Sequence, residues 1–132
     1  ISLKLVPTFT HLTLNIARCP EITDKTLISL RDLLLNSNVK YLELLLNNNP
    51  ITDNGVIELC QGIKSLSSMT YLNLGFSNCD LTDQVVNEII TAVEGHKELN
   101  TFTLSLSNTK ISSDNKNKIT QKLSNIPYLV VT

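Results

Sequence analysis

Two stretches of this chain match each other at an offset of thirty residues. TYLNLGFSNCDLTD at 70–83 repeats the pattern of KYLELLLNNNPITD at 40–53. The same offset runs through three apolar columns: Phe9, Val39, Met69 and Leu99; Leu12, Leu42, Leu72 and Phe102; Leu14, Leu44, Leu74 and Leu104. A period of roughly 20–50 residues is typical of stacked structural repeats. The period therefore constrains the fold before any other feature does.

Each unit begins with apolar and polar residues in alternation, as in YLNLG at 71–75, which predicts a strand with one buried face. A helix-start signal follows: Thr23-Asp24, Thr52-Asp53, Thr82-Asp83 and Ser112-Ser113-Asp114. Apolar residues at i, i+3 and i+7 then predict one buried stripe per helix. The stripes are Leu27, Leu30 and Leu34; Val56, Leu59 and Ile63; Val86, Ile89 and Val93; Lys116, Ile119 and Leu123. In the fourth unit, Lys116 stands where the other units have an apolar residue, which indicates either that the helix starts late or that its stripe is exposed there.

A unit of strand, turn, helix and return makes neighbouring strands parallel, because each crossover runs through a helix. We therefore expect an α/β solenoid, curved, with the parallel sheet inside and the helices outside. Its four repeats lie near 9–38, 39–68, 69–98 and 99–128, within one domain, 1–132. The chain begins with Ile1 rather than Met and ends in the strand-like PYLVVT, so we interpret it as a fragment of a longer chain.

The pattern L-x-x-L-x-L … N/C-x-x-L, which runs here from Met69 through Leu72 and Leu74 to Asn78 and Leu81, resembles the leucine-rich repeat. The thirty-residue unit with a full helix is similar to the long, ribonuclease-inhibitor-like subtype. CPEITD at 19–24 resembles the shorter, cysteine-containing subtype of F-box proteins. The resemblance covers nearly the whole chain and implies the fold, but a fold of this kind carries many functions.

One polar residue follows each strand, and we predict that these residues form a structural ladder: Cys19, Asn48, Asn78 and Asn108. Their buried side chains would bond backbone groups of the turn, which cost about 1–3 kcal/mol each if left unpaired. The leucine-rich-repeat resemblance implies the same role. On this assignment the first unit carries one extra residue between Leu14 and Cys19.

The outward positions of the strands form the candidate binding surface. Tyr41 and Tyr71 share a column and should stack, because adjacent strands lie about 4.8 Å apart, while Gly75 leaves room beside them. Tyrosine is common in binding hot spots, although tyrosine and threonine also simply favour strands. The predicted protein-binding residues are Tyr41, Tyr71, Glu43, Leu45, Asn73, His11, Thr101 and Thr103.

Composition argues against several other classes. The net charge of −1 does not supply the basic field that nucleic acids or membrane surfaces attract, and no apolar run approaches about eighteen residues. The three cysteines, Cys19, Cys60 and Cys79, form neither a disulfide framework nor a C-x-x-C metal pair. His11 and His96 lack an orienting acid and a nucleophile. We therefore expect no catalytic residue, metal or cofactor.

These observations predict a non-catalytic module that binds protein partners or acts as a scaffold. It could be a structural subunit of a large assembly such as a ciliary axoneme, in an intracellular, cytoplasmic or cytoskeletal location. The alternative is a regulatory protein. One form is a GTPase-activating protein resembling the Ran activator, which would position the GTPase's own groups. Another is an F-box substrate receptor of a ubiquitin ligase, which would need an F-box ahead of Ile1.

Overall fold

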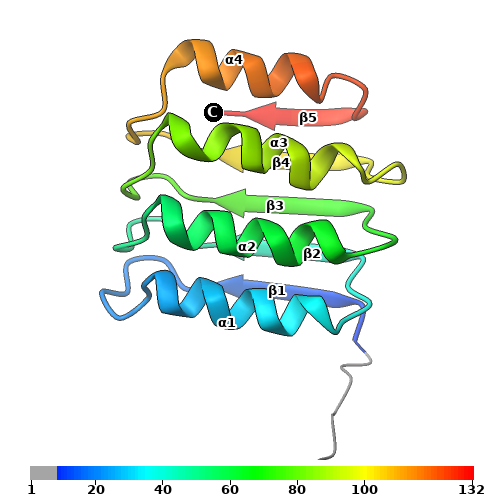
Figure 1. Cartoon of the computed structure of the whole chain (residues 1–132), viewed down its shortest axis with the longest axis horizontal. Coiled ribbons are helices and arrows are strands. Elements are labelled where there is room, and N and C mark those ends of the chain that lie inside the picture. The colour runs from blue at the N-terminus through cyan, green and yellow to red at the C-terminus, as the bar shows by residue number, and fades with distance from the viewer. Residues whose placement is uncertain (1–8) are drawn as a thin grey trace, which may run out of the picture.

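The computed structural model describes residues 9–132, in which strands and helices alternate along the chain (Figure 1). The strands are β1 (His11–Asn15), β2 (Tyr41–Leu45), β3 (Tyr71–Gly75), β4 (Thr101–Ser105) and β5 (Tyr128–Val131). The helices are α1 (Asp24–Leu35), α2 (Asp53–Ser65), the short 3-10 helix η1 (Asp83–Val85), α3 (Val86–Glu94) and α4 (Ser113–Lys122). The predicted alternation of strand and helix is confirmed.

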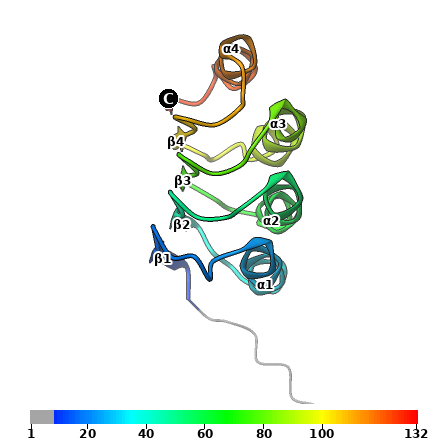
Figure 2. The same ribbon diagram turned by 90° about the vertical axis from the view of Figure 1, so that its left-hand side faces the viewer.

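The five strands form one parallel sheet in the order β1-β2-β3-β4-β5. The register pairs Tyr41 with His11 on one side and with Tyr71 on the other, and Tyr71 with Thr101. The thirty-residue offset of the sequence is thus the lateral register of the first four strands. Figure 2 shows the strands in one layer and the helices in a second layer on one side of it. The predicted α/β class with a parallel sheet is confirmed.

The core fills the space between the two layers. Alternate residues of the central strands, such as Leu42 and Leu72, are completely buried. The stripe of α2 faces them through Leu59 and Ile63, which are also completely buried. In α4 the stripe position Lys116 is half-buried although the helix begins at Ser113, so the lysine does not result from a late helix start.

The Thr-Asp signals do begin helices, and their aspartates also link neighbouring units. Asp24 Oδ1 accepts from the backbone N–H of Thr52 at 2.8 Å, and Asp53 Oδ1 accepts from that of Thr82 at 2.8 Å. Asp83 Oδ1 accepts from Ser112 N–H at 2.8 Å. Each carboxylate therefore fixes the residue that caps the next helix, and hydrogen bonds to charged groups contribute about 1.5–3 kcal/mol each. The sequence analysis did not predict this aspartate ladder.

The predicted side-chain ladder is wrong by one residue in three units. Asn48, Asn78 and Asn108 are exposed, and their φ angles are 62°, 60° and 57°. These asparagines serve the turn through the left-handed backbone conformation, which asparagine adopts more readily than most residues. The side chains that bond to the backbone belong to the next position.

The observed ladder consists of Asn49, Cys79 and Thr109. The Asn49 amide nitrogen donates to the carbonyl oxygens of Ile16 and Leu46 at 2.9 and 3.0 Å. Cys79 Sγ donates to Leu46 O at 3.4 Å, and Thr109 Oγ1 donates to the Leu106 carbonyl at 2.7 Å.

Cys19 occupies the same column and takes part through its backbone N–H, which donates to Asn49 Oδ1 at 2.6 Å. Cys19, Asn49, Cys79 and Thr109 keep the thirty-residue offset. The extra residue expected in the first unit is therefore absent, and Arg18 takes the left-handed position there, with a φ of 59°.

Candidate protein-binding face

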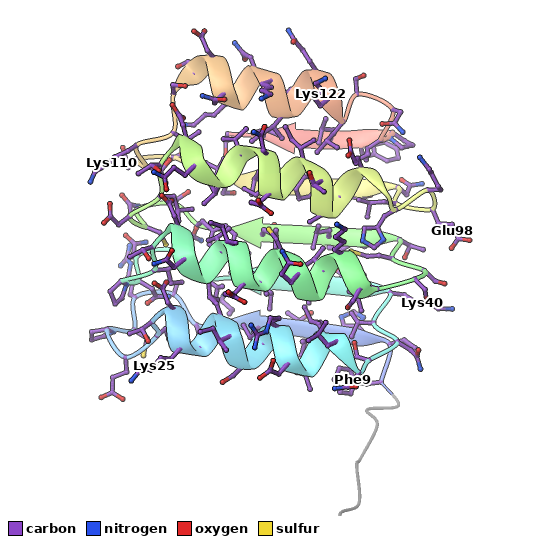
Figure 3. All side chains as sticks on the ribbon, in the orientation of Figure 1. Phe9, Lys25, Lys40, Glu98, Lys110 and Lys122 are labelled. Atoms are coloured by element: carbon purple, nitrogen blue, oxygen red, sulfur yellow. The ribbon has the colours of Figure 1, made fainter. Side chains whose placement is uncertain are left out.

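The outward side chains of the sheet form the face that the helices leave uncovered (Figure 2). On β2 and β4 these positions are half-buried, while the alternate positions are buried in the core. Figure 3 places Lys25 and Lys110 at the edge where the strands end, and Lys40 and Glu98 at the edge where they begin. These labelled charges therefore lie at the edges of the sheet rather than over its outward face.

An aromatic column crosses the first three strands. The ring centroids of Tyr41 and Tyr71 are 4.0 Å apart with an interplanar angle of 3°. The His11 ring stacks on the other side of Tyr41, at 4.0 Å and 15°. Such pairs contribute about 0.5–1.5 kcal/mol beyond the area they bury. The predicted tyrosine stack is present, and the inclusion of His11 in it was not anticipated.

The stack also perturbs the ionisation of one phenol. The pKa of Tyr41 is raised above its usual value, chiefly by the neighbouring phenol of Tyr71. Desolvation and the negative charge of Glu43 raise it further. Tyr41 is therefore a neutral, polar-tipped ring at physiological pH.

A polar column runs beside the aromatic one. Asn73 Nδ2 donates to Glu43 Oε2 at 3.0 Å, which orients the amide along the sheet. Thr13 Oγ1 and His11 Nε2 share a hydrogen bond of 3.1 Å. Thr103 lies in register with Asn73 on the next strand.

The third column contains Leu45, which is half-buried and lies in register with Gly75. The expected free space beside Gly75 is not available to a partner. A Cβ on Gly75 would lie 2.9 Å from Asn47 Nδ2 and 3.0 Å from its Oδ1. The Asn47 side-chain oxygen Oδ1 accepts from Ser77 N–H at 2.8 Å. The glycine therefore makes room for an internal hydrogen bond.

Two outward residues of β5 were missed by the sequence analysis. Tyr128 pairs in register with Thr101 and is 67% exposed, and Val130 pairs with Thr103 and is 51% exposed. These two strands are offset by 27 residues, since Thr101 pairs with Tyr128, and so they depart from the thirty-residue period. The apolar run YLVV at 128–131 reads as a strand in the sequence, but it has no polar alternation that would show which of its residues point outward.

The buried cysteines behave as apolar core residues. Burial raises the pKa of Cys60 to about 12, with a smaller contribution from the charge of Glu88. Burial also raises the pKa of Cys79, whose thiol belongs to the ladder. Both groups are therefore protonated thiols at neutral pH, and only the thiolate is a nucleophile.

Three other features would indicate a different kind of site: a metal-binding cluster, an enclosed pocket and a membrane-spanning helix. Among residues 9–132, no three His, Cys, Asp or Glu side chains are grouped so that they could hold a metal ion. The described residues also enclose no pocket. No helix between residues 9 and 132 combines the length and apolar character needed to cross a membrane. No protein-family model matches the chain, and no curated protein sequence matches it.

Proposed function

We propose that the chain is a non-catalytic module that binds another protein through the outward face of its sheet. The observation that carries this proposal is the stacked column of His11, Tyr41 and Tyr71 on that face. Stacking holds the rings in one orientation before a partner arrives. A partner then gains contact with large amphipathic side chains without the cost of ordering them.

The size of the face restricts how the partner can bind. Within residues 9–132 the sheet has five strands. With about 4.8 Å between strands and about 3.3 Å per residue along them, its flat footprint is roughly 400 Å², to which the relief of the side chains adds accessible area. A standard interface buries about 800 Å² on each partner. The strand face by itself suits an extended segment, and a globular partner would also have to contact the loop edges.

The proposal includes the leucine-rich-repeat architecture expected from the sequence, a curved solenoid with four repeats near 9–38, 39–68, 69–98 and 99–128. The parallel register and the aspartate ladder support it, because both recur from one unit to the next. A scaffold role in a large assembly such as a ciliary axoneme, and a cytoplasmic or cytoskeletal location, stay predictions from the sequence.

The test is partner capture from native extract with three proteins. The first is the wild type, the second is Tyr41→Ala/Tyr71→Ala, and the third is Lys25→Glu/Lys64→Glu, whose changes lie on helices. Circular dichroism establishes that each variant is folded. We expect the tyrosine variant to lose a partner that the lysine variant retains. Retention of every partner by the tyrosine variant would refute the proposal.

A further inference from the structure

The aromatic column contains one gap. Its positions, strand by strand, are His11, Tyr41, Tyr71, Thr101 and Tyr128. Four of these five residues carry aromatic rings, and the small side chain of Thr101 separates the last two. We call the space over Thr101, between Tyr71 and Tyr128, the Thr101 gap.

The dimensions of the gap match one flat group. Rings on adjacent strands of this column lie 4.0 Å apart. The backbones of Tyr71 and Tyr128 are two strand spacings apart, which is about 9–10 Å. A planar group stacked on Tyr71 would therefore lie over Thr101 and would have Tyr128 on its other side. The β4 side of the Tyr71 ring faces threonine, so stacking does not already cover it.

The charges of the face select a cation. Glu43 is the one acidic or basic residue, histidine apart, among the outward positions of the five described strands. The faces of aromatic rings are also electron-rich. A planar cation satisfies both conditions, and the guanidinium of arginine is the planar cationic side chain. Lysine carries the positive charge, but its ammonium group is not planar.

Asn73 supplies a hydrogen-bond acceptor in the column next to the gap, in register with Thr103. It lies on β3, two residues after Tyr71, and its nitrogen donates to Glu43. That bond uses the amide nitrogen, so the amide oxygen is the atom left to accept a hydrogen bond. A guanidinium has five N–H donors in its plane and can donate to this oxygen while it stacks on the ring. Glu43 thus acts through its charge and through the orientation of Asn73.

We propose that the Thr101 gap binds an arginine side chain carried by an extended segment of the partner protein. This inference rests on the proposed function and specifies its partner chemistry. The segment is extended because the strand face is narrow and, by itself, small for a standard interface. The bound arginine completes the aromatic column.

The probes are blocked seven-residue peptides of glycine and serine with arginine, citrulline or lysine at the centre. Citrulline has a planar side-chain group without the positive charge, while lysine has the positive charge without a planar group. Titration followed by amide chemical shifts gives each dissociation constant and locates the site. We expect the arginine peptide to bind about tenfold more tightly than either control. The largest shifts should fall on β3, β4 and β5.

Two variants test the location of the site. Thr101→Tyr fills the gap and leaves Tyr41 and Tyr71 intact, so it should weaken arginine binding about tenfold. Thr101→Ser keeps the gap open and should bind as the wild type does. Equal binding of arginine and citrulline, or unchanged binding by Thr101→Tyr, would overturn the inference.

The outcome is separable from that of the proposed function. If Thr101→Tyr still captures the native partner and Tyr41→Ala/Tyr71→Ala does not, the face binds a partner but the arginine assignment is wrong. If the tyrosine pair is dispensable for capture, the proposed function itself is wrong.

Discussion

Replacing Asn49 by leucine tests the observed ladder. The Asn49 side chain is 4% exposed and makes three hydrogen bonds with backbone groups of Ile16, Cys19 and Leu46. Leucine has the same number of side-chain heavy atoms and the same branching, leaves no cavity, and can make none of these hydrogen bonds. The variant therefore separates the loss of hydrogen bonds from the creation of a cavity.

The expected cost follows from the groups left without a partner. The Leu46 carbonyl still accepts from Cys79 Sγ at 3.4 Å. The Ile16 carbonyl and the Cys19 N–H lose the Asn49 side chain, and an unpaired buried group costs about 1–3 kcal/mol. Because Cys19 is half-buried, water can accept a hydrogen bond from its backbone N–H and reduce this cost. We expect a loss of about 2–4 kcal/mol, or about 8–16 °C in Tm.

Urea unfolding followed by circular dichroism measures this loss directly. The matched control is Asn48→Gly at the neighbouring residue, which is exposed and has a φ of 62°. Glycine adopts that conformation without strain, so the control should change the free energy of unfolding by less than about 0.5 kcal/mol. If Asn49→Leu costs no more than the control, the hydrogen-bond argument for the ladder fails.

Three further changes have defined outcomes. Asp53→Asn removes the charge that holds the next helix cap and should cost about 1–2 kcal/mol in urea unfolding; an unchanged midpoint would refute the aspartate ladder. Gly75→Ala should lower the free energy of unfolding by about 1–3 kcal/mol in a thermal melt, because its Cβ would lie 2.9 Å from the Asn47 amide nitrogen. Gly95→Ala is the control and should leave the melt unchanged, because its Cβ would meet nothing within 4 Å. The pKa of the Cys60 thiol, about 12, is raised above its value in the unfolded chain, so the stability that the protonated thiol contributes is complete below about pH 9 and is lost as the pH rises towards 12. Cys60→Ala should therefore flatten this part of the curve of unfolding free energy against pH. An unaltered curve would contradict the raised pKa of Cys60.

Periodicity predicted the regular parts of the fold because those parts depend on burial. The alternation in the strands and the stripes of the helices determine which residues face the core, as at Leu42 and Leu59. The same periodicity placed Tyr41 and Tyr71 in one column, and stacking follows from strand spacing.

Features that depend on backbone dihedrals or on lateral contacts were not predicted. Three consecutive asparagines at 47–49 look alike in sequence. The left-handed φ decides that Asn48 forms the turn and that Asn49 enters the core. The aspartate ladder joins residues of different units, such as Asp53 and Thr82, so no pattern within one unit reveals it. Tyr128 was missed because its strand departs from the thirty-residue period.

The central claim is that the outward face of the sheet contacts a partner, and site-specific photo-crosslinking tests it most directly. Benzoylphenylalanine replaces Thr103 on the outward face of β4 in one protein, and exposed Gln61 on α2 in another. After irradiation in native extract, we expect a discrete crosslinked species from position 103 that Tyr41→Ala/Tyr71→Ala abolishes, and none from position 61. Crosslinking from position 61 without crosslinking from position 103 would contradict the account and assign binding to the helices.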